Sequence, residues 1–340
     1  MRVLKLLCLY LFSCTGILLG QVEKTHVYEI VEVSFEAEKE YGNPYMDVDL
    51  WVDLEGPNNL KYRIPAFWDG GQVFRARLAA TVPGNWSWST GNATGDAGLD
   101  GQSGRFRATR WTEKEKLANP NRRGYIRISD NGHTLEYADG TPFFYTGDTW
   151  WSALTGVYMW DNPSGPSGIS FQDAVKIRKD QGFNGINIIF CFPSDLTKPI
   201  WHKNTHKKKI GEDGSTPFEM DMTEEDLAFA VNYLKINPDY WKQVDRKMKH
   251  FWENGFAPFI ETVRRSETWP EENEAEKAAF TNYVRYMWAR YGAYNWIFSW
   301  LHWDWGPGRN EAYRPMIDRA YSILGDRPYS QPLSLIHISE

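Results

Sequence analysis

The chain has 340 residues and a net charge of −6, which allows two domains and gives no basic excess suited to nucleic acid. Its aromatic content is high, with 17 Trp, 18 Tyr and 18 Phe, and the tryptophans spread from Trp51 to Trp305. Most tryptophans are largely buried in any protein, but a single core cluster does not explain this spread. The composition therefore favours a protein that stacks some of its indole rings on a ligand.

Residues 1–20 predict a secretory signal, because two cations precede the apolar stretch Leu6–Leu19. The stretch is too short for a convincing membrane span, so we expect a secreted or periplasmic protein with no spanning helix. Cys14 stands in an imperfect lipoprotein box, which leaves a lipid anchor at the outer membrane or cell surface as an alternative. Cys191 is the one cysteine beyond the signal, so no internal disulfide is expected.

Residues 24–108 predict a small β-sandwich domain. Apolar and polar residues alternate with a period of two in segments such as Tyr28–Phe35 and Met46–Val52, and Gly/Pro turns separate these segments. Residues 109–124 are charged and contain Pro120, which is typical of a linker.

Residues 125–331 change to a pattern of strand followed by helix. Ser170 and Asn237 are expected N-caps of two of the helices, and Gly182 and Gly255 are expected at their ends. Four βα units in succession predict a parallel sheet, and polar residues at the strand ends favour the first half of a (β/α)8 TIM barrel over a doubly wound sheet. No glycine-rich phosphate loop follows a strand, so no nucleotide cofactor is expected. The predicted strands are Pro142–Thr146, Phe183–Phe190, Phe256–Ile260 and Trp296–Leu301.

Residues 332–340 do not continue the strand and helix pattern. Their sequence, Pro-Leu-Ser-Leu-Ile-His-Ile-Ser-Glu, resembles translated sequencing-adapter read-through, so we interpret them as a non-native tail on a gene truncated near residues 331–334. A genuine short C-terminus is the alternative. It is disfavoured because half a barrel would leave two open strand edges with unpaired backbone groups.

The fourth predicted strand leads into Asp304, a carboxylate enclosed by tryptophans. Indole faces stack on the C–H faces of sugar rings, and apolar surroundings raise the pKa of a carboxyl group toward the range of a general acid. The segment therefore predicts a glycosidase. A helix cap or an ordinary loop carboxylate is the alternative for Asp304.

Motifs spread over residues 26–331 carry a family resemblance. They are Tyr145-Thr-Gly-Asp-Thr-Trp-Trp151, Gln181-Gly-Phe-Asn-Gly-Ile-Asn187, Ile236-Asn-Pro-Asp-Tyr-Trp-Lys-Gln-Val-Asp245 and Trp300-Leu-His-Trp-Asp304, with Phe67-Trp-Asp-Gly70 and Pro83-Gly-Asn-Trp86 in the sandwich region. Together they resemble the apiosidase-like glycoside hydrolases, secreted bacterial barrel enzymes that often follow a small β-sandwich. This chain departs from the family by having His302 and Trp303 where two glycines are common, which narrows the space beside Asp304.

A retaining glycosidase needs two carboxyl groups about 5–5.5 Å apart, and an inverting one needs about 6.5–9.5 Å. Asp304 is the expected acid/base residue, and its partner is expected on a later strand, missing from this chain if the gene is truncated. The expected sugar-contacting residues are Asp148, Trp150, Trp151, Glu261, His302, Trp303 and Trp305. The simpler alternatives are a turn cap for Asp148, an ion pair with Arg264 for Glu261 and a satisfied core histidine for His302.

Residues 198–209, here called the basic segment, follow the second predicted strand and contain Lys198, Lys203 and Lys207–Lys209. Their positive charge would attract a uronate-rich polysaccharide such as pectin, although a solvated loop is the favoured interpretation. His202 and His206 have metal-ligand spacing only on a helix, and the lysines beside them argue against a cation, so no metal is expected. The sequence as a whole predicts a glycoside hydrolase acting on a plant or algal polysaccharide, inactive as this fragment. A non-catalytic carbohydrate-binding protein is the alternative.

Overall fold

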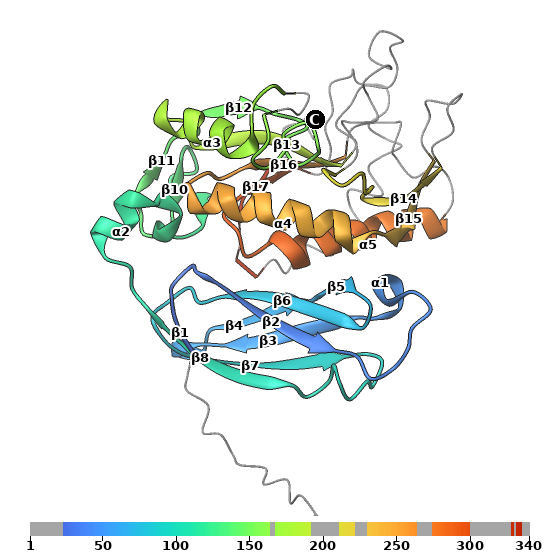
Figure 1. Ribbon diagram of the computed structural model, residues 1–340. Helices are drawn as coiled ribbons and strands as arrows, with labels where there is room; N and C mark the ends of the chain where they lie inside the picture. Colours follow the sequence, from blue (N-terminus) through green and yellow to red (C-terminus); the bar gives the residue numbers. More distant parts are fainter. Residues whose placement is uncertain are drawn as a thin grey trace, which may run out of the picture.

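The computed structural model describes residues 23–163, 167–191, 211–221, 230–263, 274–299, 328–329 and 331–334. A β-sandwich lies against a second unit, which is built from a parallel sheet and three long helices (Figure 1). The predicted signal and Cys14 lie outside the described residues.

Two sheets form the sandwich. The larger sheet has the strand order β1-β8-β7-β3-β4, and the smaller sheet has the order β2-β6-β5. All neighbouring strands are antiparallel except β1 and β8, which run parallel. The strands are β1 (Glu23–His26), β2 (Ile30–Glu36), β3 (Leu50–Glu55), β4 (Lys61–Pro65), β5 (Phe67–Gly70), β6 (Val73–Ala79), β7 (Gly84–Asn92) and β8 (Ser103–Thr109), with the short helices α1 (Pro44–Asp47) and η1 (Pro57–Asn59) between them.

The alternation in β3 shows why the sequence forms this sandwich. Val52 and Leu54 are completely buried between the sheets, whereas the intervening residues of the strand turn outward. On the outer face the indole of Trp51 lies across Gly91 of β7, where a Cβ atom would approach the ring to 2.8 Å. Glycine is therefore required at position 91 for this packing.

The predicted linker forms ordered structure. Helix α2 (Glu113–Ala118) begins at a capping box made by Thr112 and Glu115, and the turn η2 (Pro120–Arg123) follows it. Asn121 is buried and donates hydrogen bonds to two backbone carbonyl groups of the second unit, those of Trp252 and Phe256. The segment is thus fixed against the second unit.

A small antiparallel sheet precedes the parallel one. Its strands are β9 (Ile126–Ile128), β10 (Leu135–Tyr137) and β11 (Pro142–Phe143). The sequence prediction of Pro142–Thr146 as the first parallel strand is therefore wrong, because Pro142 and Phe143 pair with β10 in this antiparallel sheet. The first parallel strand is β12 (Gly147–Thr149).

The parallel sheet has the order β12-β13-β16-β17-β18, which is also the order along the chain. The remaining strands of the sheet are β13 (Gly185–Cys191), β16 (Phe259–Val263), β17 (Ile297–Ser299) and β18 (Leu333–Ser334). Strand β18 pairs with Phe298 and Ser299, so part of the segment interpreted as a non-native tail occupies a fifth position in the sheet. An antiparallel hairpin, which the sequence pattern did not predict, comes between β13 and β16 and consists of β14 (Phe218–Asp221) and β15 (Ala230–Ile236).

Helices α3 (Phe171–Asp180), α4 (Pro238–Glu253) and α5 (Glu274–Tyr291) pack on one face of this sheet. Ser170 accepts a hydrogen bond from the backbone of the first turn of α3, and Asn237 does so for α4, which confirms both predicted N-caps. Gly182 and Gly255 follow the ends of these helices with φ of +86° and +81°, as expected for C-terminal glycines.

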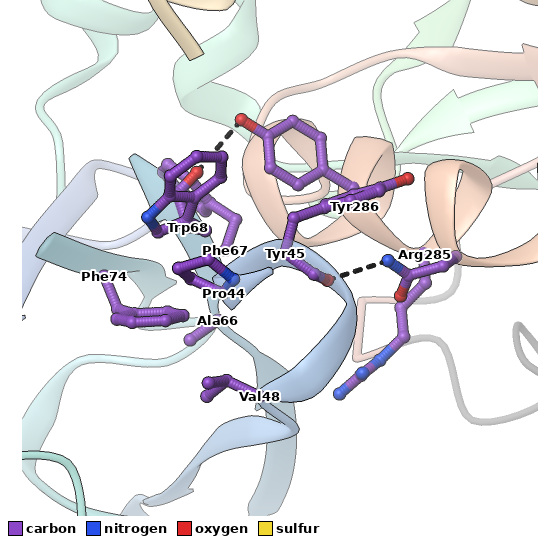
Figure 2. Close-up of a pocket in the computed structure, with 10 residues that line it drawn as sticks. Pro44, Tyr45, Val48, Ala66, Phe67, Trp68, Phe74, Arg285 and Tyr286 are labelled. Atoms are coloured by element: carbon purple, nitrogen blue, oxygen red, sulfur yellow. Dashed lines mark hydrogen bonds between the residues drawn. The ribbon is translucent and has the colours of Figure 1, made fainter. Parts of the chain in front are cut away.

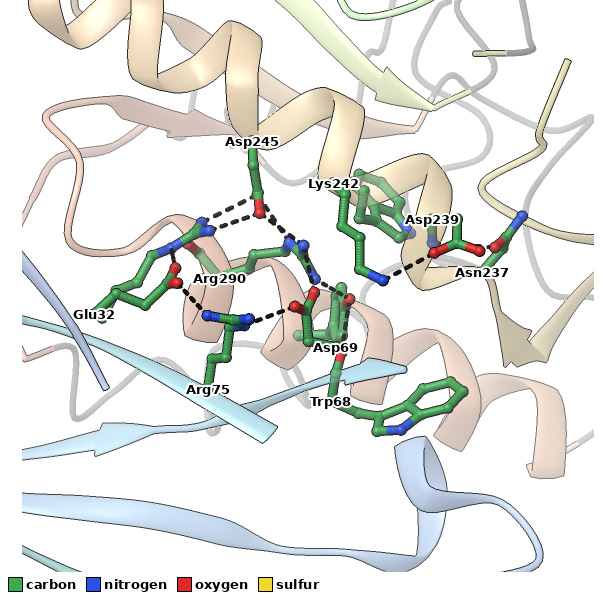
Figure 3. Close-up of polar contacts among 12 residues, drawn as sticks. Glu32, Trp68, Asp69, Arg75, Asn237, Asp239, Lys242, Asp245 and Arg290 are labelled. Carbon is green, nitrogen blue, oxygen red and sulfur yellow. Dashed lines mark hydrogen bonds and ion pairs between the residues drawn. The ribbon is translucent and has the colours of Figure 1, made fainter. Parts of the chain in front are cut away.

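A buried network of charged side chains joins the sandwich to the helices (Figure 3). Arg290 of α5 donates to Asp245 of α4 at 2.7 Å and to Asp69 of β5 at 2.8 Å. Arg77 of β6 donates to the same Asp245 at 2.6 Å and to Glu32 of β2 at 2.9 Å. Arg290 has no exposed surface and Arg77 is 5% exposed, so each guanidinium depends on these carboxylates in place of water.

Candidate functional site

Alternation along the parallel strands separates the two faces of the sheet. Ile186, Ile188 and Phe190 of β13 are buried against the helices, so Asn187 and Ile189 point to the other face. We call this other face, which α3, α4 and α5 do not cover, the inner face. Residues that pair across neighbouring strands lie on the same face, so the inner face extends from Ile189 to its partner Glu261 of β16 and from there to Ser299 of β17.

Glu261 is the carboxylate that this register places on the inner face. It is 7% exposed and lies two residues before the C-terminal end of β16. In parallel α/β barrels the functional side chains gather at the C-terminal ends of the strands. Its place near such an end, on the inner face, makes Glu261 the best candidate for a chemically active carboxyl group among the described residues.

Tyr145 and Asn187 stand beside this carboxylate. The Tyr145 hydroxyl donates to Asn187 Oδ1 at 2.7 Å, and its ring covers Gly147 and Gly185, where added Cβ atoms would lie 2.3 and 2.1 Å from it. Burial raises the pKa of Tyr145, and the charge of Glu261 raises it further. Sequence reasoning did not select either residue, although both lie in the quoted motifs. The signal available in the sequence was the glycines at 147 and 185, whose missing side chains leave room for the Tyr145 ring.

Asp148 lies on the opposite face from Glu261, because its register partner is Ile186 on the helix-covered side. It accepts from Arg178 Nε at 2.6 Å, from Trp150 Nε1 at 2.9 Å and from its neighbouring backbone N–H at 2.8 Å. Burial favours a higher pKa for this carboxyl group, but the three hydrogen bonds together outweigh burial and lower the pKa. Asp148 therefore holds an arginine and an indole in place.

The two tryptophans after β12 differ in exposure. Trp150 is 8% exposed, and its ring stacks on Tyr158 with the centroids 5.3 Å apart. Trp151 is 38% exposed, and its carbonyl accepts a hydrogen bond from Ile189 N at 3.3 Å. Because Ile189 faces Glu261 across the next strand pair, the backbone of Trp151 lies about two strand spacings, or roughly 10 Å, from that of Glu261.

Four of the predicted site residues, Asp304, His302, Trp303 and Trp305, lie outside the described residues, as do His202, His206 and Arg264. Within the described ranges, no group of three or more His, Cys, Asp or Glu side chains is arranged to hold a metal ion. In the same ranges no helix is both long and apolar enough to cross a membrane.

A small cavity lies between the sandwich and α5 (Figure 2). Its volume is about 20 Å³, which accommodates roughly one water molecule and is far below the size of a ligand pocket. Tyr286 donates to the Trp68 carbonyl at its edge, and Asn282 donates to the Tyr45 carbonyl. The cavity is a packing feature of the interface, so the inner face remains the candidate site.

The described residues form a β-sandwich joined to a parallel α/β unit, with a buried carboxylate on the sheet face that α3, α4 and α5 leave open. Family models match both units. The apiosidase-like catalytic domain matches residues 129–326, and a domain of unknown function, DUF5060, matches residues 24–93. The chain belongs to the apiosidase-like family.

One solved structure shows a similar fold, and a second matches a smaller part of the chain. A candidate glycoside hydrolase from Bacteroides vulgatus is 18% identical with a TM-score of 0.65, and the match covers 92% of this chain and 55% of that one. A family 5 glycoside hydrolase from the same organism is 17% identical with a TM-score of 0.41, covering 63% of this chain and 39% of that one. The chain thus spans about half the length of the first of these structures. None of the curated proteins matches the chain.

Proposed function

We propose that the chain is the sandwich and first part of a (β/α)8 barrel glycoside hydrolase. The strand order of the parallel sheet follows the chain without reversal, and the described helices α3, α4 and α5 share one face. A doubly wound sheet reverses its order at a switch point and carries helices on both faces. Sequential order with one covered face is the arrangement of a barrel wall.

The observation that carries the proposed activity is the position of Glu261, a buried carboxylate on the inner face of a chain that belongs to the apiosidase-like family. Glycosidic bonds are cleaved by a pair of carboxyl groups. We assign the acid/base role to Asp304, which follows β17 in the chain, and we place its partner on a later strand of the barrel. Glu261 binds a sugar hydroxyl beside them, with Tyr145 and Asn187 as its neighbours.

The substrate we propose is a plant or algal polysaccharide, with a pectin side chain as the first choice. Trp151 offers the exposed indole on which a sugar ring stacks, and the basic segment 198–209 suits a uronate. His302, Trp303 and Trp305 complete the sugar-binding set around Asp304. The structural contacts of Asp148 and Trp150 favour a supporting role for both residues. The signal at 1–20 directs the protein outside the cytoplasm, with a lipid on Cys14 as the alternative to free secretion.

Replacing Glu261 with glutamine tests the site. In the protein as its whole gene encodes it, we expect kcat/KM on a glycan released from pectin to fall about 10–100-fold, because a hydrogen bond to a charged acceptor contributes roughly 1.5–3 kcal/mol. The matched control is Glu219→Gln on β14, which changes an exposed carboxylate paired with Lys235 and is expected to leave kcat/KM unchanged. Equal kinetics in the two variants would remove Glu261 from the site.

Replacing Trp151 with alanine tests the stacking surface. We expect the Kd for pectin oligosaccharides, measured by calorimetry, to rise about 3–10-fold, which corresponds to roughly one aromatic contact. Phe144→Ala is the control, because Phe144 is 83% exposed but lies before β12, at the N-terminal end of the strands. A similar loss in both variants would argue against a specific platform at Trp151.

The rival function is carbohydrate binding without catalysis, which tryptophan platforms alone would support. A screen of plant and algal glycans, run on the protein as its whole gene encodes it, separates the two. Product release that depends on Asp304 supports the hydrolase. Tight binding with no product from any bound glycan would replace it with the binding protein.

A further inference from the structure

Residues 150–163, here called the β12–α3 loop, connect β12 toward α3 and carry Trp150 and Trp151. Three of its carbonyl groups receive the ammonium group of Lys247 from α4. The distances from Nζ are 2.6 Å to the Tyr158 oxygen, 2.8 Å to the Thr155 oxygen and 3.3 Å to the Ala153 oxygen. The Lys247 side chain therefore binds the β12–α3 loop to α4 at three backbone positions.

Lys247 is held there at an electrostatic cost. Its side chain has no exposed surface, and burial lowers its pKa to about 8 although Glu212 lies 3.2 Å away as counter-ion. A buried ammonium is tolerated only when its donors find partners, which the three carbonyls and Glu212 supply. Interior packing alone would be served better by an apolar residue, so the position is explained by what the lysine binds.

The contacts continue from Lys247 to the tryptophans. Tyr158, whose carbonyl Lys247 binds, stacks its ring on Trp150 at 5.3 Å between centroids. Trp150 in turn donates to Asp148, which Arg178 of α3 holds. The buried indole is thus fixed from both ends, and the exposed indole of Trp151 follows it in the chain.

The same side of α4 also fixes a second segment. Gln243 accepts from the backbone N–H of Glu212 at 2.8 Å and donates to Ser215 Oγ at 3.0 Å. Arg246 pairs with Glu212 at 3.3 Å, and its guanidinium lies 4.4 Å from the ring of Trp160 in the β12–α3 loop. Helix α4 therefore ties together the segments that come after β12 and after β13.

We propose that Lys247 is a positioning residue for sugar recognition: by collecting the carbonyls of Ala153, Thr155 and Tyr158 it sets the β12–α3 loop so that the Trp151 indole stands beside the inner face. This inference rests on the proposed function for its sugar ligand. The contacts that fix the loop are independent of that ligand. Lys247 touches no reacting atom in this scheme, and its effect reaches the substrate through Trp151.

The test compares Lys247→Met with Lys249→Met in the protein as its whole gene encodes it. Methionine keeps the unbranched chain up to the Cε position but lacks the ammonium group and its donors, and Lys249 is an exposed lysine of the same helix, paired with Glu253. We expect amide hydrogen exchange in residues 150–160 to speed up by about 10-fold in Lys247→Met alone, with residues 185–190 of β13 unchanged. On pectin oligosaccharides we expect KM to rise about 10-fold while kcat changes less than about 3-fold.

Exchange in residues 150–160 that stays at the wild-type rate in Lys247→Met overturns the proposal, as does faster exchange with an unchanged KM. If the protein neither binds nor cleaves any glycan, the proposed function fails, whereas the exchange result still decides whether Lys247 fixes the loop. Should Lys247→Met not fold, Tyr158→Ala removes only the stack on Trp150. It must then raise KM in the same way, and a wild-type KM in that variant counts against the inference.

Discussion

Replacing Asp245 with asparagine is expected to lower the free energy of unfolding by about 3–5 kcal/mol, the usual cost of removing one partner from a buried ion pair. Asp245 accepts from both Arg77 and Arg290, which are almost fully buried at the junction of sandwich and helices (Figure 3). An asparagine has one acceptor oxygen, and its amide hydrogens would face guanidinium donors. Two buried cations would then share only Glu32 and Asp69.

The matched control is Asp239→Asn on the same helix. Asp239 is 74% exposed and pairs with Lys242, so the change should cost at most about 1 kcal/mol. Urea denaturation followed by far-ultraviolet circular dichroism measures both variants. If Asp245→Asn loses no more stability than Asp239→Asn, the network does not hold the two units together.

The network also predicts how stability depends on pH. Burial favours a higher pKa for Asp245, but the guanidinium groups of Arg290 and Arg77 outweigh it and lower the pKa from 3.8 to about 2. A carboxyl group with a depressed pKa contributes its stability above the unfolded value and loses it as the pH falls through the folded value. The contribution of Asp245 is therefore complete above about pH 4 and disappears between about pH 4 and pH 2, a loss that Asp245→Asn should not show.

The elements that carry local signals could be predicted from the sequence. The N-caps at Ser170 and Asn237 and the glycines that end those helices are read from residue type alone, because each satisfies a specific backbone requirement. The first parallel strand could not be read in this way. The run Pro142–Thr146 is apolar enough for a buried strand, and its pairing with β10 depends on tertiary contacts that periodicity does not encode.

The residues of the candidate site also divide into those that the sequence reveals and those that depend on tertiary contacts. Glu261 and Trp151 were selectable because a carboxylate after an apolar run and a pair of indoles are visible in the sequence. The partner of Asp148 could not be predicted, because Arg178 lies 30 residues away in the sequence. The face of Asp148 could not be predicted either, because a shift of one residue in strand register moves a side chain to the opposite face of the sheet. Lys247 reads as an ordinary helix lysine until the carbonyls around it are known.

Replacing Asp304 with asparagine is expected to lower kcat about 10²–10⁴-fold on a natural glycan, with KM nearly unchanged, because a general acid acts on the leaving oxygen in the transition state. The measurement uses the protein as its whole gene encodes it, with Asp239→Asn as the control for a surface change of the same kind. The pH profile should also change, because the limb that reports the protonated acid disappears with the carboxyl group.

The leaving group distinguishes the role of Asp304 from other carboxylate roles. An aryl glycoside with a strongly acidic phenol needs little protonation to depart, so Asp304→Asn should recover most of its kcat on that substrate if Asp304 is the acid. A nucleophile is required whatever the leaving group, so a variant equally slow on both substrates would make Asp304 the nucleophile of a retaining pair. A variant as fast as wild type on both would exclude Asp304 from the mechanism and move the search for the acid to the other carboxylates of the barrel.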